Sequence, residues 1–361
     1  MHLKQHILDL PSYRPPAGGA GPAPTVRLGA NENPLGPSPR AVAAIREAAA
    51  GVNRYPGPGS WPLRHVLAAH FDLQPEMVFC TNGSDEAILL LCDAFLGPDD
   101  DAVMGSCSFI SYVQRARAAG GQLVRVPLRD HGLDLDAMAD AVTGQTRLVF
   151  LCNPNNPTGT FVGAADVARF LDRVPADALI VADEAYLDFV DRPDVPDLVA
   201  EVRRGRPNLL VLRTFAKIYG LAGLRLGYAF GAPDLIAYLD RVRPIFNVNA
   251  LAQAAAPAAL ADAEHVARGR AHAAACRERF ARELGALGLA PIPSVTNFIA
   301  FRAGDDAAVA AALAARGIAV NPLAAWGLPG YVRVTFGTDE ENDQFFAALR
   351  DIVRPAPARA S

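Results

Sequence analysis

The sequence predicts an α/β protein with a large, mostly parallel seven-stranded sheet, followed by a smaller α+β unit at the C-terminal end. Short apolar segments alternate with longer amphipathic segments up to Pro244. This alternation is typical of a parallel sheet with helices on both faces. The length of 361 residues also exceeds what one hydrophobic core usually holds, so we expect two domains.

Seven short apolar runs are the expected strands of the large sheet. We predict that they are buried on both faces, and they lie at Met77–Thr81, Ala102–Met104, Leu123–Val126, Arg147–Cys152, Leu179–Asp183, Leu209–Thr214 and Arg225–Phe230. Residues 14–24, before these runs, are rich in proline and glycine and predict an extended arm.

The region after Pro244 has a different pattern. An alanine-rich stretch from Ala250 to Leu287 predicts helix, with Pro257 as a kink or a start point. Two strand-like runs follow, at Asn297–Arg302 and Tyr331–Phe336. The predicted domains are an N-terminal arm at 1–30, a large domain at 31–245 and a small domain at 246–361.

Charge and cysteine content argue against several classes of function. A net charge of −4, from 34 basic and 38 acidic residues, gives no electrostatic signature of binding to nucleic acid or an anionic membrane. The five cysteines form no CxxC pair and lack histidines at zinc-ligand spacing, so we expect buried thiols and no metal. There is no secretory signal and no run of ~20 apolar residues, which predicts a cytoplasmic location.

Four motifs with functional groups follow predicted strands, where ligands of open α/β sheets gather. In the first, Gly83, Ser84 and Asp85 begin a predicted helix, whose free amide groups can bind an anion such as phosphate. In the second, Asn153–Gly159 has two prolines and three asparagines, and Asn156 can donate a hydrogen bond into the cleft. An ordinary capped helix and a proline-rich turn are the alternatives.

The third and fourth motifs supply a buried acid and a lysine. Asp183 ends an apolar strand, where an unpaired carboxylate is costly and needs a cationic partner. That partner is either a ligand's protonated ring nitrogen or a basic side chain, and Tyr186 could reach the same ligand. Lys217 has apolar neighbours, which lower a lysine's pKa and favour imine chemistry, and Arg225 follows among glycines. A surface lysine beside a glycine-rich loop is the alternative.

The spacing of these motifs predicts that they share one crevice. Asn156 and Asp183 are 27 positions apart, and Asp183 and Lys217 are 34 apart. Each interval is close to one strand–helix crossover of ~30 residues. We therefore expect the three groups to end successive structural units and to converge.

Together the motifs resemble the fold-type I pyridoxal phosphate-dependent aminotransferases of class I/II, and among them the histidinol-phosphate aminotransferase family. The similarity runs nearly end to end and covers, in the family's order, Asn31–Pro37 (NENPLGP), Asn53–Pro56 (NRYP), NPNNPTG, DEAY, RTFAKIYGLAGLRLGY, Asn297-Phe298 and GTDEEN. The resemblance implies pyridoxal 5′-phosphate as the cofactor. It also implies transamination between an amino donor of the histidinol phosphate type and a 2-oxo acid of the 2-oxoglutarate type.

The resemblance also implies roles in binding the cofactor. Lys217 would form a Schiff base with it and move the substrate's α-proton, and Asp183 would pair with the pyridinium nitrogen. Asn156 and Tyr186 would hydrogen-bond the phenolic oxygen. Phe109 would stack on the ring, with an ordinary core phenylalanine as the alternative. The residues implied to hold the phosphate are Arg225, Thr214 and the backbone of Gly83, Ser84 and Asp85.

Further matches imply substrate and subunit contacts. Tyr55 matches a tyrosine that reaches the cofactor phosphate of the neighbouring subunit, which implies a homodimer with shared active sites. Arg333 would bind the substrate's anionic group, because guanidinium suits carboxylate or phosphate. Pairing of Arg333 with a nearby Asp or Glu is the alternative. The substrate-pocket positions are Tyr13, Asn31, Asn156, Asn321 and Arg333.

Two positions depart from the family pattern. Ala216 replaces a serine that usually helps to hold the cofactor phosphate, a loss of ~1.5–3 kcal/mol that Thr214 could offset. Asn321 replaces an arginine that helps to bind the phosphate of histidinol phosphate, and a neutral amide cannot replace that bidentate grip. The donor could instead be an aromatic amino acid or the substrate of a specialised pathway.

Two further classes share some of these features. A decarboxylase or oxidase would use the same lysine and aspartate with pyridoxal phosphate, and formation of a keto acid with transfer of nitrogen distinguishes transamination from them. A ligand-sensing regulator fused to a DNA-binding domain is disfavoured, since nothing of domain size precedes Asn31 and the net charge is negative.

Overall fold

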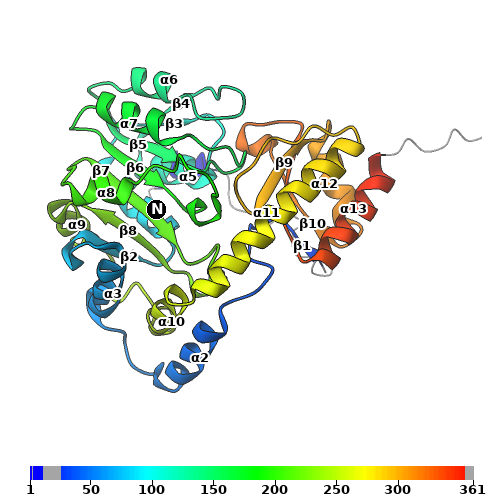
Figure 1. The fold of residues 1–361 in the computed structure, drawn as a ribbon. Coiled ribbons are helices and arrows are strands. Elements are labelled where there is room, and N and C mark those ends of the chain that lie inside the picture. Colours follow the sequence, from blue (N-terminus) through cyan, green and yellow to red (C-terminus); the bar gives the residue numbers. More distant parts are fainter. Residues whose placement is uncertain (2, 11–25, 354–361) are drawn as a thin grey trace, which may run out of the picture.

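The computed structural model describes residue 1, residues 3–10 and residues 26–353. Figure 1 shows a large body and a small body, with helix α11 running from one to the other. The helices are α1 (Gln5–Leu8), α2 (Pro39–Ala48), α3 (Trp61–Phe71), α4 (Ser84–Phe95), α5 (Ile110–Ala119), α6 (Leu135–Asp140), α7 (Ala164–Arg173), α8 (Leu198–Arg203), α9 (Pro233–Leu239), α10 (Ala250–Leu260), α11 (Ala263–Ala286), α12 (Asp306–Ala314) and α13 (Asp339–Val353). The strands are β1 (Val26–Arg27), β2 (Val78–Thr81), β3 (Asp101–Gly105), β4 (Gln122–Val126), β5 (Thr146–Cys152), β6 (Leu179–Asp183), β7 (Leu209–Thr214), β8 (Gly227–Gly231), β9 (Phe298–Arg302), β10 (Ile318–Ala319), β11 (Asn321–Pro322) and β12 (Tyr331–Thr335).

The large body contains the seven-stranded sheet that the sequence predicts. Its strand order is β2-β8-β7-β6-β5-β3-β4, and only β8 runs antiparallel to its neighbours. The predicted strands are confirmed to within two residues. The largest shift is at β8, which begins at Gly227 rather than at Arg225. Arg225 has a φ of 54°, a left-handed conformation that cannot continue a strand.

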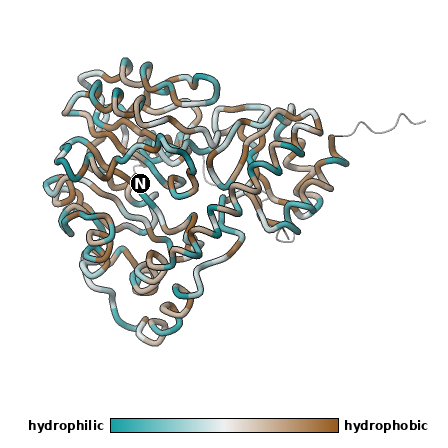
Figure 2. Tube along the Cα trace, viewed as in Figure 1, coloured by the Kyte–Doolittle hydropathy of each residue, from teal (hydrophilic) through white to brown (hydrophobic). Residues whose placement is uncertain are grey.

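Both faces of the sheet are covered because six of its strands are largely buried on both sides. The prediction of burial on both faces is wrong for β4, where Gln122 and Arg125 are exposed because this strand lies at the edge of the sheet. Phe79, Phe150 and Leu212 point to one face and pack with residues of α4, α5 and α9. Their neighbours in sequence point the other way, where Val149 and Val211 join a core with α3, α6, α7 and α8. Figure 2 shows hydrophobic residues gathered inside both bodies and hydrophilic residues at the outer turns.

The small body combines segments from both ends of the chain. Its antiparallel sheet has the order β11-β12-β9, and α12 and α13 pack beside it. The N-terminal strand β1 also belongs to the small body, where it pairs in parallel with β10 in a separate two-stranded sheet. Helix α13 begins with a capping box in which Thr338 and Glu341 each accept a hydrogen bond from the other's backbone amide.

The prediction of Pro257 as a helix start is wrong, and a kink there stays a prediction. Pro257 lies inside α10, and the alanine-rich stretch breaks at Ala261–Asp262 instead. The break occurs there because the Asp262 side chain accepts a hydrogen bond from the amide of His265 and caps the start of α11. Helix α10 packs against α2 and α3. The predicted domain boundary between residues 245 and 246 stays a prediction.

Two further sequence-based expectations concern the cysteines and membrane-spanning helices. The cysteines are buried, as expected. Among the described helices, none is both long enough and apolar enough to cross a lipid bilayer.

Candidate active site

A cavity of about 660 Å³ lies where the loops after β5, β6 and β7 meet the small body. These strands are parallel neighbours, so their carboxyl ends open at the same edge of the sheet. The structure brings most of the predicted site residues together here. Those that line the cavity are Asn31, Gly83, Ser84, Asp85, Phe109, Asn156, Asp183, Tyr186, Thr214, Lys217, Arg225, Asn321 and Arg333.

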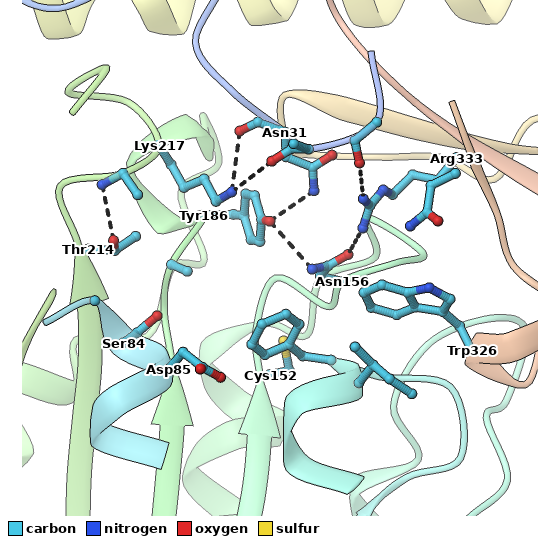
Figure 3. Close-up of a pocket in the computed structure, with 18 of the residues that line it drawn as sticks. Asn31, Ser84, Asp85, Cys152, Asn156, Tyr186, Thr214, Lys217, Trp326 and Arg333 are labelled. Carbon is cyan, nitrogen blue, oxygen red and sulfur yellow. Dashed lines mark hydrogen bonds between the residues drawn. The ribbon is translucent and has the colours of Figure 1, made fainter. Parts of the chain in front are cut away.

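Lys217 lies in the loop after β7 and points into this cavity (Figure 3). Its Nζ donates hydrogen bonds to the carbonyl oxygens of Ala30 (3.2 Å) and Asn31 (3.4 Å). Burial, and then the positive charge of Arg333, lower the pKa of Lys217 to about 8. A lysine with this pKa is still mostly protonated near physiological pH, but its neutral, nucleophilic fraction is far larger than that of an ordinary lysine.

Asp183 ends β6 and is buried beneath the cavity. Its Oδ2 accepts a hydrogen bond from the Tyr112 hydroxyl (2.7 Å), and its Oδ1 accepts one from the Ala185 amide (3.1 Å). Burial raises the pKa of Asp183, and these two hydrogen bonds oppose the rise. Within residues 26–353, no basic side chain forms an ion pair with Asp183. The carboxylate is thus placed to pair with a cation inside the cavity.

Arg333 on β12 is a buried cation at the opposite side of the cavity. It donates to the carbonyl oxygen of Gly29 (2.7 Å) and to the side-chain oxygen of Asn156. Its guanidinium also lies 5.2 Å from the ring centroid of Trp326. Burial lowers the pKa of Arg333 to about 10, which still leaves it charged at neutral pH. No Asp or Glu in the described chain pairs with it, and its buried Nε has no partner there.

A hydrogen-bond network joins the two sides of the cavity (Figure 3). The Tyr186 hydroxyl accepts from the side-chain amides of Asn31 (2.9 Å) and Asn156 (3.4 Å). Its own hydrogen therefore remains available to donate into the cavity. Burial raises the pKa of Tyr186, so the hydroxyl keeps that hydrogen. Asn31 has a φ of 55°, a left-handed conformation that asparagine tolerates, and its Oδ1 accepts from Thr335 (3.0 Å).

The start of α4 forms an anion-binding cradle beside Lys217. The amide of Gly83 is bonded to the carbonyl of Thr81, while those of Ser84 and Asp85 lie in the first helical turn, which has no side-chain cap. A Cβ on Gly83 would lie only 2.7 Å from the Arg225 guanidinium. Absence of that carbon lets a cation approach the helix N-terminus, the usual arrangement for binding a phosphate.

Comparisons with known proteins agree with this geometry. The model of the family described as aminotransferase class I and II matches residues 23–349. The chain is 46% identical over 327 residues to the histidinol-phosphate aminotransferase of Symbiobacterium thermophilum, covering 90% of each chain. It is 41% identical over 363 residues to that of Brevibacillus brevis, covering 99% of this chain and 100% of the relative. The structure of histidinol-phosphate aminotransferase from Sinorhizobium meliloti in complex with pyridoxal-5′-phosphate matches with a TM-score of 0.88 and 31% identity, over 98% of this chain and 97% of that one.

The chain belongs to the class I and II aminotransferase family. It is a fold-type I enzyme that uses pyridoxal 5′-phosphate. The site of this aminotransferase fits that cofactor. Lys217, whose pKa is lowered, suits the aldehyde. The buried carboxylate of Asp183, which has no cationic partner among the described residues, suits a protonated ring nitrogen. The helix N-terminus at Gly83 suits the phosphate.

At the cofactor end, the side chains of two predicted residues already have hydrogen-bond partners within the chain. The Asp85 carboxylate is held by Ser111 and by Arg115 (2.5 Å), so only its backbone is free to bind an anion. The Thr214 hydroxyl donates to the Leu226 carbonyl (3.2 Å) and accepts from the Ala216 amide (3.0 Å). A contact from Thr214 to a phosphate would therefore require exchange of the Leu226 carbonyl for the phosphate.

Several site residues of this aminotransferase were missed by the sequence reasoning. Tyr112 binds Asp183, and the signal for it was its place one helical turn after Phe109, whose ring it meets at 5.6 Å between centroids. Trp326 lines the cavity over Arg333 and lies 6.3 Å from Phe109. Nothing local to the sequence marks Trp326, because a tertiary contact brings it to the cavity.

One predicted site residue lies outside the cavity, and one is not described. The Tyr55 side chain is 82% exposed and stacks on Phe246 at 4.7 Å, outside the cavity of its own chain. This position neither supplies nor excludes a contact with a second subunit. Tyr13 lies outside the described residues.

Proposed function

We propose that this aminotransferase takes the amino group from histidinol phosphate, or from a closely related amine with an anionic group, and passes it to a 2-oxo acid. The observation that carries the proposal is Arg333. It is a buried guanidinium without a carboxylate partner in the described chain, and it lies across the cavity from Lys217. Burying an uncompensated charge is costly unless a counter-ion occupies the site during function.

The chain's own groups account for the proton movements. Pyridoxal phosphate, when bound, supplies an aldehyde that takes up the amino group and a ring that accepts the electron pair released at the substrate's α-carbon. Lys217 would bind that aldehyde and would move the proton at the substrate's α-carbon, a role that its lowered pKa supports. Asp183 holds the proton on the ring nitrogen, with Tyr112 and Ala185 keeping the carboxylate oriented.

Positioning is shared among the other residues around the cavity. Tyr186 and Asn156 direct hydrogens toward the phenolic oxygen, and Phe109 lies against the ring. The Ser84 and Asp85 amides, Arg225 and Thr214 hold the phosphate. Arg333 binds the donor's anionic group, while Asn31 and Asn321 border it.

An aromatic amino acid is the second candidate donor. Asn321 offers no positive charge, and the rings of Phe109 and Trp326 make an apolar wall in the same cavity. An aromatic amino acid would place its carboxylate at Arg333 and its ring against this apolar wall. This candidate requires only the one buried cation.

A single-turnover half-reaction distinguishes the two donors. Cofactor-loaded enzyme is mixed with excess histidinol phosphate or excess phenylalanine, and the aminated form of the cofactor is measured by chromatography after quenching. Rapid conversion with histidinol phosphate supports the proposal and makes Asn321 a tolerated variation. Conversion only with phenylalanine, or with neither, overturns it.

We also propose that the enzyme is a homodimer with shared active sites in the cytoplasm, in which Tyr55 reaches the phosphate of the other subunit. The high exposure of Tyr55 outside its own cavity supports this arrangement. Each of the variants Lys217→Ala and Tyr55→Phe should have little activity at limiting cofactor. Mixing them should create one intact site per heterodimer and regain activity. Mixtures that show no regain would contradict shared sites.

A further inference from the structure

Arg27 and Arg333 line the same cavity from two short sheets of the small body. In the parallel pair of β1 and β10, Arg27 is opposite Ala319. Two residues later, Asn321 on β11 is opposite Arg333 on β12. Figure 1 shows β1 and β10 together in the small body. Only Val320 separates β10 from β11, so these two pairs lie one after the other along the chain. We call the four residues Arg27, Ala319, Asn321 and Arg333 the row; it contains a step of two residues along the chain between Ala319 and Asn321.

Alternation along the strands directs this whole row toward the cavity. Val26 and Leu28, on either side of Arg27, are buried in the core. Ile318 and Val320, on either side of Ala319, are buried there too. Successive side chains of extended segments point to opposite faces, so Arg27 and Ala319 face away from that core, while Val320 reaches both the core and the cavity wall. All four of its members line the cavity.

The two arginines differ in how strongly they are held. Arg333 is buried and fixed by hydrogen bonds to Gly29 and Asn156. Among the described residues, Arg27 makes one ion pair, to Glu32 at 3.0 Å, and the two side chains are 67% and 39% exposed. Exposed pairs of this kind contribute little stability. Arg27 can therefore exchange Glu32 for another anion at small cost, and the small side chain of Ala319 beside it leaves space.

We propose that Arg27 is a specificity-determining residue that binds the second anionic group of a substrate whose first anionic group lies at Arg333. The inference rests on the proposed function only in taking Arg333 as the first anion site. Substrates with two anionic groups, such as dicarboxylates, engage both arginines. Substrates with one anionic group engage Arg333 alone. Asn321 lies between them as a neutral spacer.

The test compares glutarate with its monoamide, two ligands of nearly equal shape that differ by one negative charge. Binding to cofactor-loaded enzyme is measured by isothermal titration calorimetry, which does not depend on turnover. The wild type should bind glutarate ~10-fold more tightly than the monoamide, the effect of one charge-assisted contact. Arg27→Gln should make the two affinities equal to within about 2-fold. Arg316→Gln, which removes an exposed arginine outside the cavity, should leave the wild-type ratio unchanged.

Two further variants separate a ligand contact from a structural role. The double variant Arg27→Gln/Asn321→Arg places a new cation two residues after Ala319, the residue opposite position 27. This cation should restore the preference for glutarate. Glu32→Gln frees Arg27 and should keep or increase that preference. Equal weakening of both ligands by Arg27→Gln, or the same defect in Glu32→Gln, would overturn the proposal. A wild type that prefers glutarate but does not convert histidinol phosphate would sink the proposed donor and leave the role of Arg27 standing.

Discussion

The two ends of the active-site cavity are built in different ways. The cofactor end lies on the large sheet, where Asp183 and Lys217 follow adjacent parallel strands. The substrate end lies on short strands of the small body, where Arg27 and Arg333 come from opposite ends of the chain. The cofactor end has Lys217, Asp183 and the start of α4 in place and departs from the family pattern only at Ala216, whereas the substrate end has the neutral Asn321 between two arginines. Chemistry and specificity can thus change separately in this fold.

Replacement of Lys217 should give the largest effect and test the cofactor end alone. Lys217→Ala should lower turnover by about 10³-fold or more, because it removes both the covalent anchor and the proton carrier. The sequence contains two lysines, so Lys4→Ala is a matched control. Borohydride reduction followed by peptide mass spectrometry should find the cofactor on Lys217 only. Retained turnover in Lys217→Ala would show that catalysis does not depend on Lys217.

Replacement of Arg333 should damage the substrate end while sparing cofactor binding. Arg333→Gln should lower kcat/KM for anionic donors by about 100-fold, the scale expected when one partner of a buried charge pair is lost. The charge of Arg333 lowers the pKa of Lys217, so its removal should raise that pKa above about 8. The rate of cofactor attachment to apoenzyme should then rise with pH at a higher midpoint than in the wild type. An unchanged midpoint would show that the two ends do not interact.

Glycine at position 227 should matter for the cradle at the cofactor end. A Cβ there would lie 2.4 Å from the Ser84 amide nitrogen, so Gly227→Ala must displace the start of α4. We expect a cofactor dissociation constant that is about 10-fold higher and a loss of about 1–3 kcal/mol in unfolding free energy. Gly223→Ala, with no atom within 4 Å of the new carbon, is the control. Equal behaviour of the two variants in fluorescence titrations would contradict the cradle.

Removal of the Tyr112 hydroxyl should have a smaller effect that depends on pH. Its hydrogen bond lowers the pKa of Asp183, so Tyr112→Phe should raise that pKa further. The acid limb of the kcat/KM profile should move to higher pH, with a loss of about 3- to 10-fold at neutral pH. Tyr228→Phe removes a buried hydroxyl on β8 that does not contact Asp183, and its profile should match the wild type. An unshifted acid limb in Tyr112→Phe would show that Tyr112 does not set the pKa of Asp183 during catalysis.

The last prediction is tighter binding of the cofactor. Ala216 lines the cavity next to Thr214, whose hydroxyl is already bonded to the Leu226 carbonyl. Ala216→Ser adds a donor beside the cradle and should lower the cofactor dissociation constant by about 3- to 10-fold. Weaker cofactor binding in this variant would mean that the cradle has no room for the hydroxyl.

The sequence was sufficient for the large sheet and for the cofactor end because both depend on local signals. Apolar runs mark the strands, and a motif follows directly on each strand end, so chain order and spatial order agree for Asn156, Asp183 and Lys217. Gly83 likewise predicts a tight turn before a helix. Such groups need no information about distant parts of the chain.

The substrate end depends on contacts that the sequence does not encode locally. Trp326 and Arg27 reach the cavity only through the packing of the small body and the pairing of β1 with β10. Strands of two residues leave no periodic pattern to detect. Pro257 was misjudged for a related reason, since the Asp262 cap decides where the helix breaks and the proline is tolerated inside α10.

The central claim, that Lys217 and Arg333 together act on an anionic amine, is tested most directly by following nitrogen. Histidinol phosphate labelled with nitrogen-15 is incubated with the cofactor-loaded enzyme and 2-oxoglutarate, and glutamate is analysed by mass spectrometry. The account predicts one labelled glutamate for each donor molecule consumed. Labelled ammonia in place of glutamate, or no consumption of the donor, would contradict it.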